Sequence, residues 1–575
     1  MAKTTVADLL ADLLIQANVK TVWGLPGDSL NGFTEALRVR EDISWRGVRH
    51  EEVAALAATY EADAHGGLAV CAGSCGPGNL HLINGLFEAQ RANVPMVAIA
   101  AQIPSSEIGL GYFQETHPQN LFAECSDWCE LVANPAQVPQ VFEAAMNSAI
   151  TNRSVSVIVL PGDVAVAEAP VRKVRWQPPV RPTVVPPDDA LQNLAGLIDN
   201  SDNIAILGGF GCDGYHDQVV ALAEKIKAPI VHALRGKQSL EHDNPYDVGM
   251  TGLIGFSSGY EALKKCDLLL MLGTNFPYRD FYPDHGNIVQ IDIRGHHLGR
   301  RSPLTMGLVG DIGPTLDRLL PMLQTHESRR FLDISLDNYR EARKDLDELA
   351  TPRDDGNPLH PQYLTARASE LAAEDAVFTA DVGTPTVWAA RYLQLNGKRR
   401  LSGSWMHGSM AVAVPAAMGW QAAYPERQVV ALAGDGGVSM LMGDLITLVN
   451  EKLPVKVIVY NNETLGFVAM EMKAAGYVDT TTDMPTVDYA GMAESLGIFS
   501  LKVHDSSKLD EALTQAFDHD GPALVDVRTA KQELSMPPRI EAAQAKGFSL
   551  YMLRAVMSGK GDEVIDLGKT NWLGR

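Results

Sequence analysis

The fold is decided by the stretch Val429-Val430-Ala431-Leu432-Ala433-Gly434-Asp435-Gly436. Its apolar half is typical of a buried parallel strand, and its glycines end that strand in a tight turn. Residues 438–449 then have the pattern of a helix, residues 455–460 form a second apolar run, and Asn461-Asn462 follows it. This order predicts a doubly wound α/β sheet with Asp435 and Asn462 at its carboxyl edge, where such sheets bind small molecules.

The polar residues at this edge are oxygen donors. Asp435 supplies a carboxylate, Asn462 supplies an amide oxygen, and a backbone carbonyl of the same turn can add a third oxygen. Mg²⁺ prefers few protein ligands of this kind and completes its octahedron with water and phosphate oxygens. The spacing therefore predicts a magnesium site that holds a diphosphate group, whereas a Gly-Asp-Gly tripeptide alone also fits an ordinary strand-to-helix loop.

Length and composition describe a large protein with well-packed domains. The chain has 575 residues, of which 46% are hydrophobic, and this length predicts three or four domains. Its formal charge of −22 opposes non-specific nucleic-acid binding, which needs a positive surface. Asp8 and Asp12 interrupt the first apolar pattern, and no apolar run approaches the roughly 18 residues that span a bilayer. We therefore expect a cytoplasmic protein whose membrane contact is at most peripheral.

Six cysteines are too few for a disulfide framework in a chain of this length. The pairs Cys71/Cys75 and Cys125/Cys129 have a spacing at the edge of the range for zinc sites, and no histidine pair follows them. We therefore predict that these cysteines are buried structural thiols.

Three breaks divide the alternating helix and strand patterns of the chain. Residues 170–187 are dense in proline, residues 351–361 are polar and contain proline, and Ser535-Met536-Pro537-Pro538 leads into a tail. We predict domains at residues 1–182, 183–335 and 336–530, with a tail at residues 531–575. The first and third domains are similar in length but show no convincing residue-level repeat.

In the second domain, the residues at the ends of several predicted strands are typical of nucleotide-binding sites. One predicted strand ends in Gly273-Thr274 and the next ends in Asp292. Gly208-Gly209-Phe210-Gly211 is only a partial dinucleotide fingerprint. These strand ends favour a nucleotide cofactor at the carboxyl edge of the second sheet.

Arg49-His50-Glu51-Glu52 opens a predicted helix after a probable strand. Acidic residues in a first helical turn complement the helix dipole, which is the ordinary explanation. Together with the Gly-Asp-Gly and Asn-Asn pattern, this motif resembles the cofactor signature of thiamine diphosphate enzymes. The resemblance implies that Glu51 hydrogen-bonds the aminopyrimidine ring, which then removes the thiazolium C2 proton. It also implies that Asp435, Asn462 and the carbonyl of Thr464 hold Mg²⁺.

Longer segments resemble the flavin-dependent pyruvate oxidases, and most closely their quinone-linked, acetate-forming subgroup, the pyruvate:quinone oxidoreductases. The segments that carry this resemblance are residues 71–79, 111–118, 248–255 and 569–573. The resemblance extends along essentially the whole chain. It implies three doubly wound parallel-sheet domains that bind the pyrimidine ring, FAD and the diphosphate in that order, followed by a C-terminal amphipathic tail.

The same resemblance assigns residues to each part of the site. It implies that FAD is bound by Thr251, Gly252, Leu253, Ile254, Thr274, Asn275, Phe276, Pro277, Tyr278, Asp292 and Asp311. Thiamine diphosphate is flanked by His407, Gly408, Ser409, Met410, Asp435, Gly436, Gly437, Asn462, Thr464, Leu465, Gly466 and Phe467, and Met410 bends it. The pyruvate pocket is formed by Phe113, Gln114, Val382, Phe467 and Glu471.

The implied reaction is the oxidative decarboxylation of pyruvate to acetate and CO₂, in which FAD passes the electrons to ubiquinone or menaquinone. In this family the pyrimidine and diphosphate domains meet across a subunit boundary. Glu51 of one chain is therefore expected to face Asp435 of another, in a tetramer or at least a dimer.

Other chemistries stay open within the resemblance. Acetolactate synthesis uses the same cofactors but forms a carbon–carbon bond, and another oxidase subtype uses phosphate and O₂. A non-catalytic scaffold is the alternative from a different class of protein. It predicts the loss of Glu51, Asp435 or Asn462, and all three residues are present.

The tail has an apolar helical face. Phe548, Met552, Ala555 and Val556 recur at helical spacing with Tyr551 beside them, and Gly559 and Gly561 interrupt the pattern. Composition alone favours docking of this helix on its own domain. Its likeness to the membrane-binding segment of the quinone-linked enzymes, together with Trp572, implies an interfacial helix instead. We then expect peripheral binding to phospholipid at the inner face of the cell membrane when the enzyme is activated.

Overall fold

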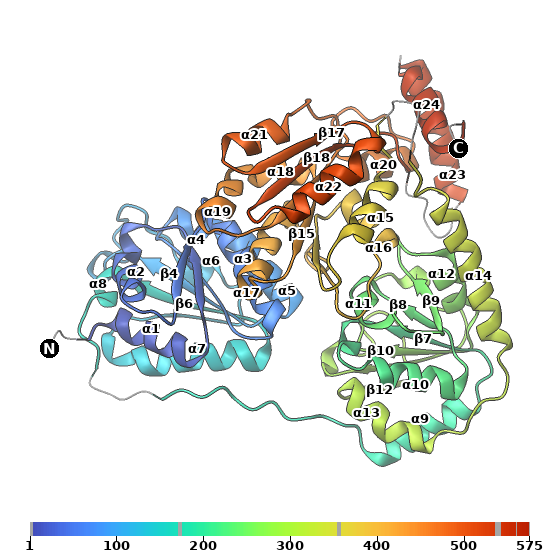
Figure 1. Ribbon diagram of the computed structural model, residues 1–575. Helices are drawn as coiled ribbons and strands as arrows, with labels where there is room; N and C mark the ends of the chain where they lie inside the picture. Colours follow the sequence, from blue (N-terminus) through green and yellow to red (C-terminus); the bar gives the residue numbers. More distant parts are fainter. Residues whose placement is uncertain (1–3, 171–174, 353–357, 535–541, 559, 574–575) are drawn as a thin grey trace.

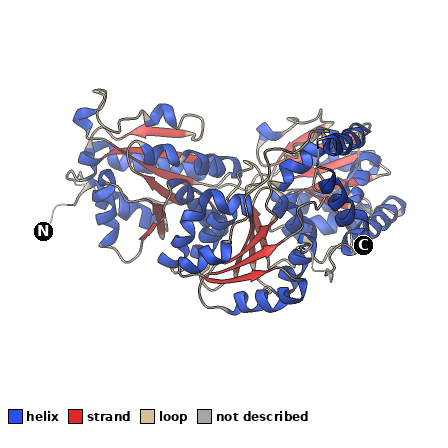
Figure 2. Ribbon diagram, turned by 90° about the horizontal axis from the view of Figure 1, so that it is seen from above, coloured by secondary structure: helices blue, strands red, loops and turns tan. Residues whose placement is uncertain are grey.

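The computed structural model describes residues 4–170, 175–352, 358–534, 542–558 and 560–573. These residues form three α/β units, each built on a six-stranded sheet whose paired strands run parallel. Helices lie on both sides of the strands (Figure 2). This architecture confirms the predicted class, an α/β protein with three doubly wound parallel sheets.

The first sheet has the strand order β2-β1-β3-β4-β6-β5. Its strands are β1 (Thr21–Gly24), β2 (Ser44–Gly47), β3 (Ala69–Gly73), β4 (Met96–Gln102), β5 (Trp128–Leu131) and β6 (Val155–Pro161). The helices of this unit are α1 (Val6–Gln16), α2 (Asn31–Arg38), α3 (Glu51–His65), α4 (Pro77–His81), α5 (Ile83–Ala92), α6 (Pro118–Leu121), α7 (Val138–Asn152) and α8 (Gly162–Ala165).

The second sheet has the order β12-β11-β10-β7-β8-β9. Its strands are β7 (Ile204–Gly208), β8 (Ile230–His232), β9 (Asp247–Met250), β10 (Leu268–Leu272), β11 (Asn287–Asp292) and β12 (Met306–Val309). The accompanying helices are α9 (Asp188–Asp199), α10 (His216–Ile226), α11 (Lys237–Leu240), α12 (Ser257–Lys265), α13 (Ile312–Leu319) and α14 (Arg330–Asp347). The extended segment before α9 crosses from the first unit to the second (Figure 1).

The third sheet has the order β14-β13-β15-β16-β18-β17. Its strands are β13 (Val377–Ala380), β14 (Arg400–Gly403), β15 (Val429–Gly434), β16 (Lys456–Asn461), β17 (Phe499–Val503) and β18 (Ala523–Arg528). Its helices are α15 (Pro361–Leu371), α16 (Thr384–Tyr392), α17 (Ala413–Ala423), α18 (Asp435–Leu441), α19 (Leu445–Asn450), α20 (Gly466–Ala474), α21 (Tyr489–Ser495) and α22 (Leu509–Asp518).

The helix predicted over residues 438–449 is wrong in both its start and its continuity. The helix α18 begins at Asp435 itself, directly after β15, and a 3₁₀ turn at Met442–Asp444 separates α18 from α19. Gly443 lies inside that turn, where a residue without a side chain weakens a continuous helix. Asp435 is therefore the first residue of a helix rather than a residue of an open loop.

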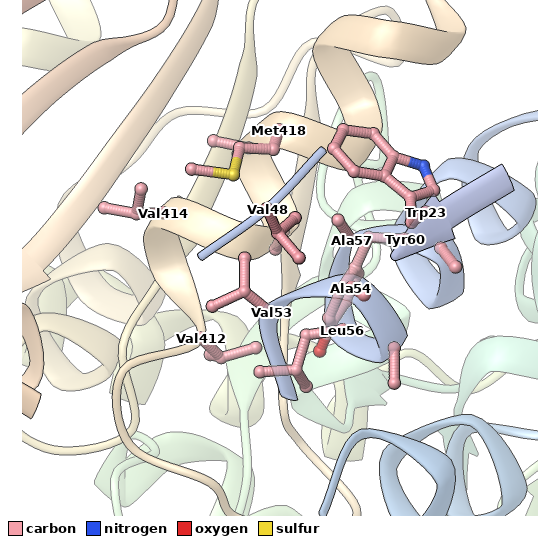
Figure 3. Close-up of a cluster of buried hydrophobic side chains, with 14 of the residues drawn as sticks. Trp23, Val48, Val53, Ala54, Leu56, Ala57, Tyr60, Val412, Val414 and Met418 are labelled. Atoms are coloured by element: carbon pink, nitrogen blue, oxygen red, sulfur yellow. The ribbon is translucent and has the colours of Figure 1, made fainter. Parts of the chain in front are cut away.

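The first and third units share one hydrophobic core. The helix α3 packs against α17, and Figure 3 shows apolar side chains of both units meeting there. A Cβ atom placed on Gly419 would lie 2.2 Å from the carbonyl oxygen of Ala57, so only glycine permits this approach of the two backbones. The two units therefore form one packed body within the chain.

The tail docks on the third unit through a face that includes Phe548, Met552 and Ala555 of the predicted one. In α23 (Ala542–Met557), Tyr551 and Ala555 are fully buried, but Val556 points outward and is 61% exposed. The helix α24 (Gly561–Gly568) follows and packs against α23. Gly559, residues 535–538 and the side chain of Trp572 lie outside the described residues. Among the described residues, no helix combines the length and apolarity needed to cross a bilayer.

The four cysteines whose spacing is at the edge of the range for zinc sites are free thiols. Cys71, Cys75 and Cys125 are buried, and Cys129 is half-buried. Burial raises the pKa of Cys125 to about 12, so this side chain behaves as a small apolar residue at neutral pH.

Candidate cofactor-binding site

The predicted metal residues lie at the topological switch point of the third sheet. The chain runs outward from β13 to β14 and then returns to the other side of β13 to form β15. In such sheets the connections leave opposite faces at this point and open a crevice at the carboxyl ends of the strands. Asp381 follows β13, Asp435 follows β15, and Asn462 follows β16, so three polar residues line this edge.

One hydrogen-bonded turn joins the three predicted metal ligands. The buried carboxylate of Asp435 accepts the N–H of Gly436 at 2.8 Å and that of Glu463 at 2.7 Å. The amide oxygen of Asn462 accepts the N–H of Thr464 at 3.1 Å, and the carbonyl of Thr464 accepts the N–H of Gly466 at 2.8 Å. Burial raises the pKa of Asp435 to about 6 against the effect of these donors.

This donor set fits a magnesium diphosphate. A carboxylate, an amide oxygen and a carbonyl are hard oxygen donors, and few protein ligands leave room for phosphate oxygens. The hydroxyl of Thr464 is buried without a partner among the described residues. A Cβ atom on Gly436 would lie 2.6 Å from Leu465 and 3.3 Å from the Met410 methyl group, so Met410 and Leu465 close over this turn.

Asp381 is a site residue that the sequence interpretation missed. Its carboxylate is 2% exposed and accepts the N–H groups of Ala413 at 2.9 Å and Gly434 at 3.0 Å. A Cβ atom on Gly437 would lie 2.0 Å from one of its oxygens. Burial raises the pKa of Asp381 to about 6. An acidic residue directly after a strand was the signal that identified Asp435, and Asp381 carries the same signal, next to the half-buried Val382.

Glu51 is the first residue of α3 and is 4% exposed. One of its carboxylate oxygens lies 2.9 Å from Nδ1 of His81, and the rings of His81 and His50 stack with centroids 4.4 Å apart. A Cβ atom on Gly78 would lie 2.9 Å from the other oxygen. A carboxyl group is thus held in a narrow, largely desolvated position, as the assigned role requires.

The start of α3 contacts the third unit of the same chain. The N–H of Arg49 donates to Asp444 at 2.7 Å, and the N–H of Gly47 donates to Glu451 at 2.9 Å. The residues around Glu51 and those after α18 are therefore adjacent within one chain. That Glu51 faces Asp435 of a second chain stays a prediction.

The predicted pyruvate-pocket residues divide into two groups. Phe467 and Glu471 both lie on α20, close to the turn that contains Asn462 and Thr464. Phe113 is 78% exposed, and Gln114, at a φ of 61°, lies against Gly76 and within 3.3 Å of the Cys75 sulfur. The structure thus brings the α20 residues to the diphosphate edge and leaves Phe113 on the surface of the chain.

The predicted flavin residues lie at or just after the ends of β9, β10, β11 and β12, on either side of the switch point between β10 and β7 of the second sheet. A Cβ atom on Gly209 would lie 2.7 Å from the carbonyl of Gly273, so the two glycine turns interlock there. Near this point the hydroxyl of Thr251 and the amide oxygen of Asn275 are buried without partners among the described residues. Unpaired buried polar atoms at a nucleotide edge fit a bound dinucleotide that supplies their partners.

The other predicted flavin residues surround this edge. Gly252 has a φ of 106°, Leu253 is 49% exposed, and the carbonyl of Ile254 accepts a hydrogen bond from Arg391 at 3.0 Å. Thr274 and Phe276 are buried, and the ring of Phe276 lies edge-on to that of Tyr278, which follows Pro277.

Two acidic residues predicted to contact the flavin have different surroundings. Asp292, at the end of β11, accepts the N–H of Arg294 at 2.8 Å. Both carboxylate oxygens of Asp311 bind the preceding linker, through Arg181 at 3.2 Å and the N–H of Val184 at 2.8 Å. Asp292 therefore stands at the strand edge, whereas Asp311 holds the linker on the second unit.

Comparisons with known proteins agree with this division into three units. The family descriptions that match are "Thiamine pyrophosphate enzyme, N-terminal TPP binding domain" at residues 4–121, its central domain at residues 191–319, and its C-terminal TPP binding domain at residues 381–527. A putative thiamine pyrophosphate-containing protein of Bacillus subtilis, YdaP, is 38% identical over 99% of both chains.

Two further relatives have named activities. A pyruvate oxidase of Lactiplantibacillus plantarum is 29% identical over 88% of this chain and 86% of its own. An acetolactate synthase large subunit of Parasynechococcus marenigrum is 31% identical over 94% of this chain and 91% of its own. The chain is similar to both along most of its length.

Proposed function

The chain belongs to the thiamine pyrophosphate enzyme family, and from this premise we propose that it oxidises pyruvate to acetate and CO₂ through FAD. The observation that carries the proposal is that α20 and the predicted flavin edge adjoin the same buried cluster. Phe467 of α20 and Ile254 of the second unit pack against the same buried cluster. Burial, and after it the charge of Glu471, raises the pKa of Tyr278, so this α20 residue acts electrostatically on the predicted flavin edge. A pyruvate pocket on α20 would thus adjoin the redox site.

The residues of the chain have separate tasks in this reaction. Asp435, Asn462 and the carbonyl of Thr464 would hold Mg²⁺ and through it the diphosphate. One oxygen of Glu51 is held by His81, and the other oxygen would hold the proton that the aminopyrimidine ring needs. When bound, thiamine diphosphate supplies the electron sink for decarboxylation and FAD supplies the oxidant. Phe467 and Val382 would shield the reacting carbon from water.

We also propose that the enzyme works as a dimer or tetramer. Leu110, Tyr112 and Phe113 are 72%, 46% and 78% exposed in the single chain. Their loop is ordered, because Glu115 accepts the N–H groups of Gly111 at 2.7 Å and Tyr112 at 3.2 Å. An ordered loop that exposes three large apolar side chains is typical of an interface. A second chain on this loop would bring Phe113 and Gln114 to a pocket.

A quinone as electron acceptor and activation by lipid are supported by where the tail docks. The helix α23 packs against α20, and Arg554 donates to the carbonyl of Gly476 at 2.7 Å. Its outer face exposes Leu553, Val556 and Met557. Release of α23 would expose the buried Tyr551 and Ala555 as well and would free α20 beside the pocket. A membrane that binds the released helix then favours the open state, at the inner face of the cell membrane.

One assay tests this function. Purified protein is incubated with pyruvate, thiamine diphosphate, MgCl₂, FAD and ferricyanide, with and without phospholipid vesicles, and the products are identified by NMR. We expect one acetate for every two ferricyanide ions reduced, and a higher rate with vesicles. Absence of dye reduction would contradict the oxidase, and an unchanged rate with vesicles would contradict lipid activation.

Acetolactate synthesis is the second candidate, because the acetolactate synthase large subunit is 31% identical over most of both chains. In the same assay it predicts acetolactate and unreduced ferricyanide. Acetyl phosphate and peroxide, formed only with phosphate and O₂, would instead identify the phosphate-dependent oxidase.

A further inference from the structure

One face of α5 contacts the loop that contains His407 and Met410. Asn84, Phe87 and Glu88 stand at positions i, i+3 and i+4 of the helix, so their side chains share one side. All three contact residues 404–409, which lie more than 300 positions further along the chain. We name this set the α5 clamp.

Asn84 uses both ends of its amide group. Its nitrogen donates to the hydroxyl of Ser409 at 2.9 Å and to the carboxylate of Glu52 at 2.7 Å. Its oxygen lies 2.8 Å from Nε2 of His407 and can only accept, so the proton of the neutral imidazole resides on Nε2. Burial and the nearby charge of Arg91 lower the pKa of His407, which keeps the ring neutral at pH 7.

Phe87 and Glu88 hold the rest of the loop. The ring of Phe87 stacks on His407, with centroids 5.7 Å apart and an interplanar angle of 12°. Glu88 is 1% exposed and accepts the hydroxyl of Tyr60 at 3.0 Å and the hydroxyl of Ser404. The oxygen of Ser404 in turn accepts the N–H groups of Gly408 and Ser409, each at 2.9 Å. Through Ser404, the first unit thus fixes two backbone amides of the loop.

The loop at residues 404–410 ends beside the turn at Gly436, where the diphosphate is predicted to bind. Ala411 has a φ of 62°, a conformation that an L-residue adopts only when its surroundings impose it. Met410 lies between this residue and the turn at Gly436, where its methyl group would be 3.3 Å from an added Cβ. The position of the loop therefore sets the position of Met410 over the site.

We propose that Asn84, Phe87 and Glu88 are positioning residues that preorganise the His407–Met410 loop for thiamine diphosphate. The inference rests on the proposed function, because it takes this loop as a wall of the coenzyme site. A loop that is already ordered loses less conformational entropy when the coenzyme binds. Loss of the clamp should therefore weaken coenzyme binding more than it changes turnover at saturation.

Hydrogen exchange of the protein without coenzyme tests the clamp directly. In N84A and in E88Q we expect the amides of Gly408 and Ser409 to exchange at least tenfold faster than in the wild type. We expect thiamine diphosphate, titrated calorimetrically with MgCl₂, to bind at least tenfold more weakly. Gln90→Ala is the matched control, since Gln90 lies on the same helix and its side chain forms no hydrogen bond with the loop among the described residues. Its exchange and binding should match the wild type.

A charge change at Asn84 gives a readout that a purely structural role would not move. In N84D a carboxylate replaces the amide between Glu52 and His407, so the pKa of His407, followed by NMR, should rise by about one unit. The charge of Arg91 lowers the pKa of His407 in the wild type and in N84D alike, so it does not contribute to the difference. The smaller variant F87L tests the stacking contact if the polar variants fold poorly.

Two outcomes separate this inference from the proposed function. Wild-type exchange and binding in N84A, E88Q and F87L would overturn the clamp, even in an active enzyme. Absence of any thiamine diphosphate binding by the wild type would overturn the coenzyme role of the loop together with the proposed function. In that case, faster amide exchange of Gly408 and Ser409 in the clamp variants, but not in Gln90→Ala, would still establish that α5 holds the loop.

Discussion

Glu51 combines burial with a hydrogen-bond contact to His81, which is the arrangement expected of a proton-handling carboxyl group. E51Q keeps the size of the side chain and its contact with His81 but removes the ability to take up a proton. Because such groups contribute about 10²- to 10⁴-fold to rate, we expect pyruvate turnover to fall by that range with an unchanged melting temperature. Steady-state kinetics and thermal unfolding check both parts. E41Q, at an exposed position, is the control, and near-normal turnover in E51Q would refute its role.

The site residues that the sequence reveals are those whose chemistry is visible locally. Glu51 and Asp435 are acidic residues at the start of a helix or the end of a strand, and the type of residue at that place is already informative. Asn84 and Glu88 give no such signal, because an amide and a carboxylate on a helix surface are commonplace. Their role depends on contacts with Ser409 and Ser404, more than 300 residues away, which no local pattern contains.

A buried histidine in the second unit predicts a specific sensitivity to acid. His232 is 1% exposed, and burial with the nearby charge of Lys237 lowers its pKa to about 3. Below pH 6.5 the unfolded chain binds a proton at this position and the folded chain does not, so stability decreases as the pH falls. The limiting slope is about 1.4 kcal/mol per pH unit.

We expect the H232Q variant to lose less stability than the wild type between pH 7.5 and 5.5. Urea unfolding at several pH values measures this difference, and carboxylates that titrate in that range, such as Asp381 and Asp435, are present in both proteins. H504Q is the control, because His504 is exposed. Parallel stability profiles for the wild type and H232Q would contradict the assignment.

At the scale of elements, the apolar runs at residues 429–433 and 455–460 predict β15 and β16 to within one residue. These bounds can be predicted because a buried parallel strand is determined by its local pattern. The region after Asp435 was predicted as one helix but forms α18, a 3₁₀ turn and α19. The same apolar spacing fits both arrangements, and the packing around Asp444, which binds the N–H of Arg49, exists only in the folded chain.

The contact between α23 and α20 predicts that one methyl group can release the tail. A Cβ atom on Gly547 would lie 2.0 Å from the carbonyl of Ala474, so G547A must separate the two helices. We expect faster proteolysis of the tail and, if release activates, a higher ferricyanide rate without vesicles and a smaller increase with them. A545S adds one atom at an exposed position of the same helix and should behave as the wild type. Unchanged proteolysis in G547A would disprove the docking contact.

At the scale of the whole molecule, the first and third sheets share one topology. Each places its strands in the order second, first, third, fourth, sixth, fifth, whereas the middle sheet has the order third, second, first, fourth, fifth, sixth when read from β9. The sequences of the two outer units show no matching repeat, so this likeness is a property of chain path alone. Strand order follows from contacts between distant segments, and only composition, period and length are visible in the sequence.

The exposed loop at residues 110–113 is predicted to lie in the interface between two chains. Leu110 is 72% exposed, and L110D would place a charge inside an apolar interface without touching the core of the chain. We expect the dimer of L110D to dissociate at protein concentrations at least tenfold higher than the wild type does, as measured by analytical ultracentrifugation. Specific activity should fall in the same concentration range, because the second chain would cover Phe113 and Gln114. V180D, at a linker position that is 94% exposed, adds the same charge and should leave both properties unchanged. An L110D protein that associates and turns over like V180D would show that this loop faces solvent in the working enzyme.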